Sequence, residues 1–432
     1  MTTVENRYKK SFAHYQEAKK FLPNQTQTLS KGPGQFVIGQ MPLFNQKAKG
    51  CYVWDVDGNK YIDFIGGRWP IILGYANPIT DNAVKAQLKR GITFPQSHPL
   101  ELEVAKLLTE VIPSAEMARF AKNGSDATGG AVRIARAYTK REIILQCGYH
   151  GAQDWYIITT ERNAGVPKVL KKLIYTFEYN SIGSLEKLFK RFKNKAAAVI
   201  MEPMYDKFPK NNFLKKVKEL THKNGALLIF DEIITGFRWS LGGAQKYFGV
   251  TPDLACFGKA MANGMPISCV VGKKEIMQKT EDVFLSMTYG GECLSLAAAK
   301  ATITAMKNNP GILKHIWRMG AILQKGIRGL ITKHGLNDFA ECVGVPPTPV
   351  MHFKSARGQN VLAVKALFQK YLMDQGIMYA AYWNITYSHK FPHINFALRA
   401  ADRAFAELKE DIAKNRVSQK MKNYPQPVFK NV

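Results

Sequence analysis

Several features that mark large classes of protein are missing from this sequence of 432 residues. It has no run of about 18 apolar residues, the minimum for a membrane-spanning helix. Its charged N-terminal stretch lacks the apolar core of a secretory signal peptide. No GxxxxGK[ST] loop is present, which excludes a P-loop ATPase. We therefore expect a cytoplasmic protein with no membrane partner.

Cysteine is also scarce, and its spacing is uninformative for metal binding. The six cysteines form no CxxC pair and lie far apart, at Cys51, Cys147, Cys256, Cys269, Cys293 and Cys342. Zinc sites and disulfide frameworks need closer or paired spacing. We expect buried, reduced thiols and no metal site.

Acidic residues are few relative to basic ones, 33 against 61, so the net charge is +28. Such a field attracts anions, either nucleic acid or an acidic small molecule. The densest basic stretch, Lys187 to Lys195, carries apolar residues at helical spacing and is typical of a solvated amphipathic helix. A regulator that binds DNA would need a separate helix-turn-helix module, but a predicted hairpin at Asp57-Gly58 already begins within the first 60 residues. We expect no nucleic-acid partner, and an anionic substrate stays open.

The sequence does contain the pattern of an α/β protein. From about residue 80 to 310, short apolar runs alternate with segments of helical period. This alternation predicts a mostly parallel central sheet covered by helices. From residue 311 the pattern changes to long helices with few strands, which indicates a smaller α+β domain. We predict an N-terminal segment (1–75) that packs with the small domain, a large domain (76–310) and a small C-terminal domain (311–432), with a loosely held tail from about Lys414.

Two charged groups follow apolar strands of the predicted large domain. The run ALLIFDE delivers Asp231 to a strand end, and the run LACFGK delivers Lys259 to another, 28 residues later. A buried carboxylate needs a partner, so Asp231 alone is compatible with a simple ion pair. A lysine that loses hydration tends towards the neutral amine, which Schiff-base chemistry requires. Ligands of such sheets gather at the carboxyl ends of the strands.

Two further motifs supply an anion seat and an aromatic ring. Gly124 and Ser125 open a helix whose first N–H groups are suited to a phosphate. Tyr149 and His150 follow another strand, where Tyr149 could stack on a flat ring, although core packing explains either residue taken alone. Anion seat, aromatic ring, carboxylate and amine together are the groups that pyridoxal phosphate needs.

The stretch FDEIITGFR…LGGAQKYFGVTPDLACFGKAMANGMP resembles the class III aminotransferases, which adopt fold type I. The resemblance spans roughly residues 25–410, and within this family the sequence is similar to the glutamate-1-semialdehyde aminomutases and related aminotransferases. It implies that Lys259 forms the internal aldimine and moves the substrate proton. It implies that Asp231 keeps the pyridine nitrogen protonated, and that Ile233 and Tyr149 cover the two ring faces. The implied cofactor-binding set is Gly124, Ser125, Tyr149, His150, Glu202, Asp231, Ile233, Lys259 and Thr288.

The resemblance also implies a homodimer with shared active sites, because Thr288 matches a threonine that reaches the phosphate from a second subunit. The expected activity is transfer of an amino group from an amine or amino acid to a carbonyl acceptor. The alternative is a glutamate-1-semialdehyde 2,1-aminomutase. A mutase must retain its intermediate behind a long gating loop, and the segment after His150 lacks that insertion, which favours transamination.

Four residues are candidates for the substrate pocket. Arg68 and Trp69 lie in GGRWP, where the sequence departs from its relatives, and Arg238 and Trp239 follow TGF. An arginine could clamp a substrate carboxylate with two hydrogen bonds. Each pair could equally face solvent or a dimer partner, and both interpretations stay open.

Overall fold

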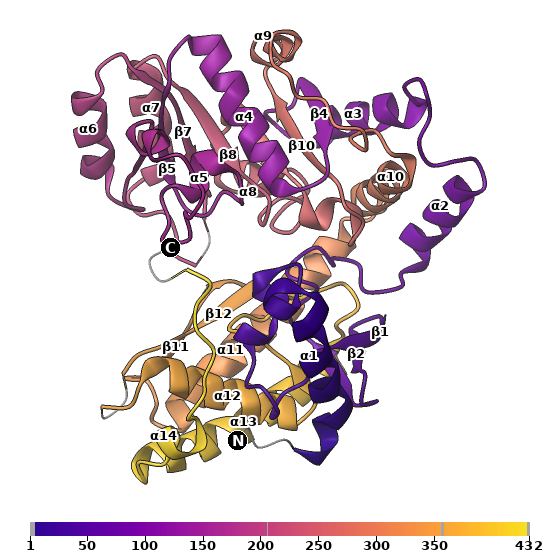
Figure 1. Cartoon of the computed structure of the whole chain (residues 1–432), viewed down its shortest axis with the longest axis vertical. Coiled ribbons are helices and arrows are strands. Elements are labelled where there is room, and N and C mark those ends of the chain that lie inside the picture. The colour runs from indigo at the N-terminus through magenta and orange to yellow at the C-terminus, as the bar shows by residue number, and fades with distance from the viewer. Residues whose placement is uncertain (1–4, 205, 356–357, 430–432) are drawn as a thin grey trace. The chain divides into compact units, whose positions relative to one another are not determined.

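The computed structural model describes residues 5–204, 206–355 and 358–429 (Figure 1). The chain divides into two compact units. The large unit comprises Pro78–Leu313 with Phe429–Val432, and the small unit comprises Met1–Asn77 with Lys314–Val428. Among the described helices, none combines the length and apolar character that crossing a bilayer requires.

A seven-stranded sheet forms the core of the large unit, in the order β4-β10-β9-β8-β7-β5-β6. Neighbouring strands from β6 to β9 run parallel, whereas β10 is antiparallel to both β9 and β4. Every residue of β5, β7, β8 and β9 is buried, as expected for apolar strands covered on both faces. The prediction of a mostly parallel sheet covered by helices is therefore confirmed. The strands are β4 (Met117–Ala121), β5 (Ile143–Cys147), β6 (Ile174–Thr176), β7 (Ala196–Met201), β8 (Leu227–Asp231), β9 (Leu254–Phe257) and β10 (Ser268–Gly272).

Helix α4 crosses this sheet and packs against strands from β7 to β10 (Figure 1). Its buried face consists mainly of small residues, so the helix axis can lie close to the strands. The other helices of the large unit are α2 (Pro78–Leu88), α3 (Pro99–Val111), α5 (Asp154–Ile157), α6 (Ile182–Arg191), α7 (Phe213–Lys223), α8 (Gly243–Phe248), α9 (Lys274–Met277) and α10 (Cys293–Asn308), with α4 at Gly124–Thr139. Short 3₁₀ turns complete it: η5 (Lys168–Lys172), η6 (Lys259–Ala262) and η7 (Gln278–Glu281).

The small unit contains a four-stranded sheet in the order β1-β2-β3-β13 and a separate hairpin of β11 and β12. Strands β2 and β3 pair antiparallel across Gly58, whose φ is +89°, so the predicted hairpin is confirmed. The strands are β1 (Asn45–Lys49), β2 (Tyr52–Asp55), β3 (Lys60–Asp63), β11 (Ala340–Val345), β12 (Thr348–Phe353) and β13 (Ile377–Met378). The helices are α1 (Lys9–Phe21), α11 (Gly311–Lys333, which begins in the large unit), α12 (Val361–Asp374), α13 (Phe391–Ala413) and α14 (Val417–Lys420), with 3₁₀ turns η1 (Asn6–Tyr8), η2 (Pro23–Gln25), η3 (Leu29–Lys31) and η4 (Pro33–Gln35).

The expectation of a loose tail from Lys414 is wrong for the first part of that segment. Helix α14 is anchored by Lys420, whose Nζ lies 2.8 Å from Oδ2 of Asp411. Arg416 pairs with the other oxygen of Asp411 at 2.9 Å. Val417 and Met421 are buried. The polar composition concealed a set of ion pairs around one buried carboxylate.

Candidate active site

The carboxyl ends of the parallel strands bring the predicted site residues to one edge of the large sheet. Cys147 of β5 pairs with Met201 of β7, which pairs with Phe230 of β8, so these three strands end side by side. The next residues along the chain are Gly148 to His150, Glu202, and Asp231 itself. Ligands bind at this edge in open α/β sheets, because the loops after the strands converge there.

Asp231 is buried and hydrogen-bonded from two directions. Its Oδ2 lies 2.9 Å from Nδ1 of His150, whose side chain is fully buried. Its Oδ1 accepts the backbone N–H of Ile233 at 3.1 Å. Each carboxylate oxygen has a second lone pair, so Asp231 retains capacity to accept one more donor.

Glu202 ties the tyrosine loop to this carboxylate. Its Oε2 accepts the backbone N–H of Tyr149 at 2.9 Å. Burial raises the pKa of the Glu202 carboxyl to about 7, the nearby Asp231 charge adds to that rise, and the charges of His150 and Lys259 oppose it. Gly148 allows this approach: its φ is +110°, and an added Cβ would lie 2.6 Å from Glu202 Oε2.

Lys259 follows β9 directly and opens the 3₁₀ turn η6 with a φ of +40°, in the left-handed region that non-glycine residues seldom occupy. Strained backbone of this kind concentrates at functional sites. The preceding residue, Gly258, approaches Ile233 so closely that an added Cβ would lie 3.2 Å from Cδ1 of that side chain. Lys259 thus belongs to the same cluster as Asp231 and Glu202.

The first turn of α4 reaches the same place. A Cβ at Gly124 would lie 3.2 Å from Ile233, and Ser125 Oγ accepts the N–H of Ala152 at 2.9 Å. Among the described residues, the N–H groups of Gly124 and Ser125 have no acceptor. Exposed N–H groups at a helix start favour an anion, because the helix dipole adds to the field.

Tyr149 keeps its ring accessible beside this cluster. The side chain is 43% exposed. Its ring meets Tyr156 edge-on at 5.4 Å between centroids and lies 5.7 Å from the ring of Phe429. A half-exposed aromatic ring can take a flat ligand on its open face.

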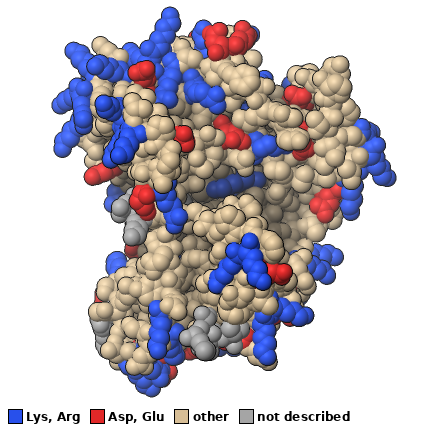
Figure 2. Space-filling model, viewed as in Figure 1, with Lys and Arg blue, Asp and Glu red and all other residues tan. Residues whose placement is uncertain are grey.

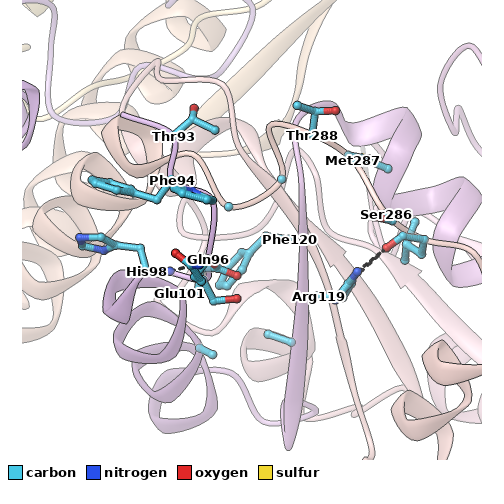
Figure 3. A pocket seen from close by; sticks show the side chains of 17 residues that line it. Thr93, Phe94, Gln96, His98, Glu101, Arg119, Phe120, Ser286, Met287 and Thr288 are labelled. Carbon is cyan, nitrogen blue, oxygen red and sulfur yellow. Dashed lines mark hydrogen bonds between the residues drawn. The ribbon is translucent and has the colours of Figure 1, made fainter. Parts of the chain in front are cut away.

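Thr288 lines a different cavity of the large unit, of about 490 Å³ (Figure 3). That cavity lies between the segment from Thr93 to His98 and the segment from Leu285 to Gly291. Arg119 holds the second segment by donating to the Leu285 carbonyl oxygen at 2.7 and 2.9 Å. The lining contains none of the Asp231 cluster, so within one chain Thr288 is separate from it.

The two arginine–tryptophan pairs lie in different units. Arg238 and Trp239 are buried in the large unit, where the Trp239 ring contacts Tyr247 and Phe248, each at 5.9 Å. Arg68 and Trp69 are half-buried in the small unit, where Trp69 stacks on Tyr382 at 4.1 Å. Contact of any of these four with a substrate stays a prediction.

Comparison with known families decides the class of protein. The family model described as "Aminotransferase class-III" matches residues 37–344, well over half of the chain. The chain belongs to the class III aminotransferases. The predicted family and activity are thereby confirmed.

Named relatives of the enzyme carry two activities. It is 39% identical to the glutamate-1-semialdehyde 2,1-aminomutase of Alkaliphilus oremlandii over 79% of this chain and 85% of that protein. The chain is 36% identical to the 3-aminobutyryl-CoA aminotransferase of Cloacimonas acidaminovorans over 93% of this chain and 98% of that protein. In structure it resembles the FumI protein of Sphingopyxis sp. MTA144, solved in its PLP internal aldimine form (TM-score 0.87, 27% identity, covering 93% and 97%). The mostly parallel sheet and this likeness confirm fold type I.

The predicted cofactor residues of the aminotransferase therefore fall into two groups. Eight of them lie on the loops that meet at the strand ends: Gly124, Ser125, Tyr149, His150, Glu202, Asp231, Ile233 and Lys259. Thr288 lies apart. The sequence did not predict the role of Glu232, whose side chain points away from the Asp231 cluster. Its fully buried carboxylate accepts the N–H groups of Ala244 (2.6 Å) and Gln245 (2.8 Å) and the hydroxyl of Thr235. The loop after β8 is thereby held in place.

Proposed function

We propose that this aminotransferase holds pyridoxal 5'-phosphate on the Asp231 cluster and moves an amino group from an amine or amino acid to a carbonyl acceptor through Lys259. Pyridoxal phosphate is the cofactor of the class. The observation that supports the assignment of residues is the clustering of charges: His150 contacts the buried Asp231 carboxylate, and the charges of Asp231, His150 and Lys259 all act on the Glu202 carboxyl.

The residues present fit such a group. Asp231 retains an acceptor for a protonated ring nitrogen, and the half-exposed Tyr149 offers a face for the ring. The N–H groups of Gly124 and Ser125 have no other acceptor and suit a phosphate. Bound there, the cofactor supplies an electron sink for charge that develops at the substrate carbon.

The protein's own groups then have distinct tasks. Asp231 would keep the ring nitrogen of the bound cofactor protonated, and the 2.9 Å contact with His150 holds the carboxylate in place. Lys259 Nζ would take the proton from the substrate carbon that carries the amino group and would then act as the acid that returns it. Glu202 positions the Tyr149 loop through the backbone N–H that it accepts. Tyr149 restricts the ring to one plane.

A homodimer completes this proposal. Next to Thr288 the large unit exposes two aromatic side chains, Phe284 at 82% and Tyr289 at 61%. Large exposed apolar groups mark protein interfaces. We propose that a second copy of the chain covers them and brings its own Thr288 to the phosphate. Sedimentation of the wild type and of a Phe284→Ser/Tyr289→Ser variant tests this, and a wild type that sediments as a monomer contradicts it.

Transamination is favoured over the aminomutase reaction because the segment after His150 forms only the short helix α5. The relatives named above carry out each of these reactions, so both acidic amines and 5-aminolevulinate belong in the test. An acidic substrate also agrees with the net charge of +28.

The test is visible absorption of the purified holoenzyme during addition of single amines. An ordinary donor should bleach the cofactor band, and a keto acid should restore it. Lys259→Ala should remove both responses, whereas Lys246→Ala, at an exposed position on α8, should leave them intact. A response to 5-aminolevulinate alone would favour the aminomutase, and an identical spectrum for wild type and Lys259→Ala contradicts the assignment of Lys259.

A further inference from the structure

The turn after β3 in the small unit has a strained backbone. Four consecutive residues, from Gly66 to Trp69, have φ values of +58°, +60°, +72° and +76°. Glycine tolerates that region, but Arg68 and Trp69 occupy it at a cost. Asp63 fixes the start of the turn by accepting the N–H groups of Ile65 (2.7 Å) and Gly66 (2.9 Å). This strained backbone conformation sets the direction in which the Arg68 side chain leaves the turn.

Arg68 is poorly satisfied where this turn places it. One guanidinium nitrogen, Nη1, donates to the Tyr382 hydroxyl over a long 3.4 Å. The other, Nη2, is buried and has no hydrogen-bond partner among the described residues. Buried guanidinium groups are normally paired, because desolvating the charge is costly. An unpaired buried nitrogen therefore calls for a partner that comes from outside the chain.

A second cation shares the pocket. Lys365, a half-buried residue of α12, lines with Arg68 a cavity of about 70 Å³. Among the described residues, no ion pair or side-chain hydrogen bond of Lys365 is found. Burial lowers the pKa of Lys365, and the charge of Arg68 lowers it further. The remaining lining is neutral: Gln35, Leu362, Ala366, Gln369, Ala380, Ala381, Pro425, Gln426 and Pro427.

Asp63 offsets the charge of Arg68 only in part: burial raises the pKa of the Asp63 carboxyl, and the charge of Arg68 opposes that rise. Asp63 lies with Arg68 on a neighbouring cavity of about 200 Å³. Its oxygens already accept two backbone N–H groups and the Tyr75 hydroxyl at 2.8 Å, and the described residues include no ion pair between Asp63 and Arg68. Arg68 and Lys365 repel one another, and Asp63 acts on Arg68 from the neighbouring cavity, so the cavity that both cations line contains no carboxylate. A bound anion would relieve this repulsion.

We propose that Arg68 and Lys365 together bind an oxyanion, the carboxylate or phosphate group of an acidic substrate. The identification as a substrate group rests on the proposed function, whereas anion binding itself does not. The cavity of about 70 Å³ has room for one such group. The planar guanidinium fixes the orientation of the anion, and the ammonium adds a point charge.

Direct binding to the holoenzyme is the first test, because the cofactor then fills its own phosphate seat. Calorimetric titrations use inorganic phosphate and propionate, which separate the two oxyanion classes. We expect at least one of them to bind, with affinity at least about tenfold weaker in Arg68→Met and Lys365→Met. Lys365→Arg should retain binding, and so should Lys187→Met, at an exposed position on α6.

Three outcomes would overturn the proposal: no binding of either anion to the wild type, unchanged binding in both pocket variants, or equal loss in Lys187→Met. Thermal unfolding of each variant identifies any that fails to fold. If Lys365→Met does not fold, binding by the charge-conserving Lys365→Arg tests the role of Lys365 instead.

A second measurement links the pocket to the substrate. β-Alanine, O-phosphoethanolamine and propylamine share a two-carbon amine and end in a carboxylate, a phosphate or a methyl group. In Arg68→Met and Lys365→Met, the half-saturating concentration of the acidic amine should rise at least about tenfold with an unchanged limiting rate, and that of propylamine should not move. An equal rise for propylamine overturns the proposal. If no amine reacts with the wild type, the proposed function fails, and the binding titration still decides the pocket.

Discussion

Two sets of charged residues, one in each unit, are arranged in opposite ways. At the strand ends of the large unit, the acids have partners within the chain. Asp231 accepts from Ile233 and pairs with His150, and Glu202 accepts from Tyr149. In the small unit, Arg68 donates one long hydrogen bond of 3.4 Å to the Tyr382 hydroxyl. No side-chain hydrogen bond of Lys365 is found among the described residues.

This difference distinguishes residues that are preorganised by bonds within the chain, such as Asp231, from residues that lack such bonds and can bind a ligand, such as Arg68. A buried acid with internal partners keeps its position whether or not the site is filled, which is what preorganised chemistry needs. A buried cation with no partner becomes stable only when an anion arrives. The degree of internal satisfaction thus distinguishes the two kinds of site before any ligand is seen.

The largest expected effect contrasts the acids of the two regions. Asp231→Asn removes the charge opposite His150 and the ring nitrogen, so we expect kcat to fall about 10²–10³-fold. Asp63→Asn loosens only the turn that aims Arg68, so we expect an unchanged kcat and a higher KM for the acidic amine. Steady-state kinetics of both variants measure this. Equal losses of kcat would mean that the two acids do not differ in role.

The acid Glu202 should make the stability of the large unit depend on pH. Its pKa is raised from 4.5 to about 7, so the folded state holds a proton that the unfolded state releases between those values. Stability from this group is complete below about pH 4.5 and is lost as pH rises towards 7. Relative to the isosteric Glu202→Gln, the wild type should therefore lose up to about 3 kcal/mol of unfolding free energy over that range. Urea titrations at pH 5 and pH 8 test this, and parallel curves would show that Glu202 is ionised throughout.

The large-unit cluster was largely predictable from sequence, because strands that end in Asp231 and Lys259 have an apolar pattern that places their next residues at one sheet edge. The resemblance added Ile233 and Glu202. The hydrogen-bond partners could not be predicted. The spacing of the residues indicates neither the hydrogen bond between His150 and Asp231 nor the one that Glu232 accepts from Ala244.

The small-unit pocket was only half predictable. Arg68 was a candidate because GGRWP departs from its relatives, but a left-handed arginine leaves no signal in composition. Lys365 was invisible, because a lysine within the apolar pattern of α12 has the same spacing as an ordinary solvated one. Its cavity is lined in part by Pro425, Gln426 and Pro427, some 60 residues later. Long-range packing of this kind is not encoded in local periodicity.

Helix α12 offers a matched pair of lysines for the next prediction. Lys370 pairs with Glu5 at 2.9 Å and Asp374 at 2.7 Å, whereas Lys365 has only a like charge nearby. Lys365→Met should raise the unfolding free energy by up to about 1 kcal/mol, because it removes, at similar volume, a half-buried charge that Arg68 repels. Lys370→Met should lower it by about 0.5–1 kcal/mol. Denaturant titrations of both variants decide, and a loss of stability in Lys365→Met would mean that the chain already compensates this charge.

The smallest effect is expected from the charges that dominate the surface. Figure 2 shows Lys and Arg gathered over the part of the large unit that holds α6 and α7, where Lys187 and Lys190 are exposed. Exposed charges act weakly beyond the Debye length, about 8 Å at physiological salt. A Lys187→Gln/Lys190→Gln variant should therefore change the KM for O-phosphoethanolamine less than about twofold at 0.15 M salt. It should shift the KM measurably only at low salt. A rise in KM as large as that of Lys365→Met at 0.15 M salt would mean that the field of the whole surface, rather than Arg68 and Lys365, selects the anion.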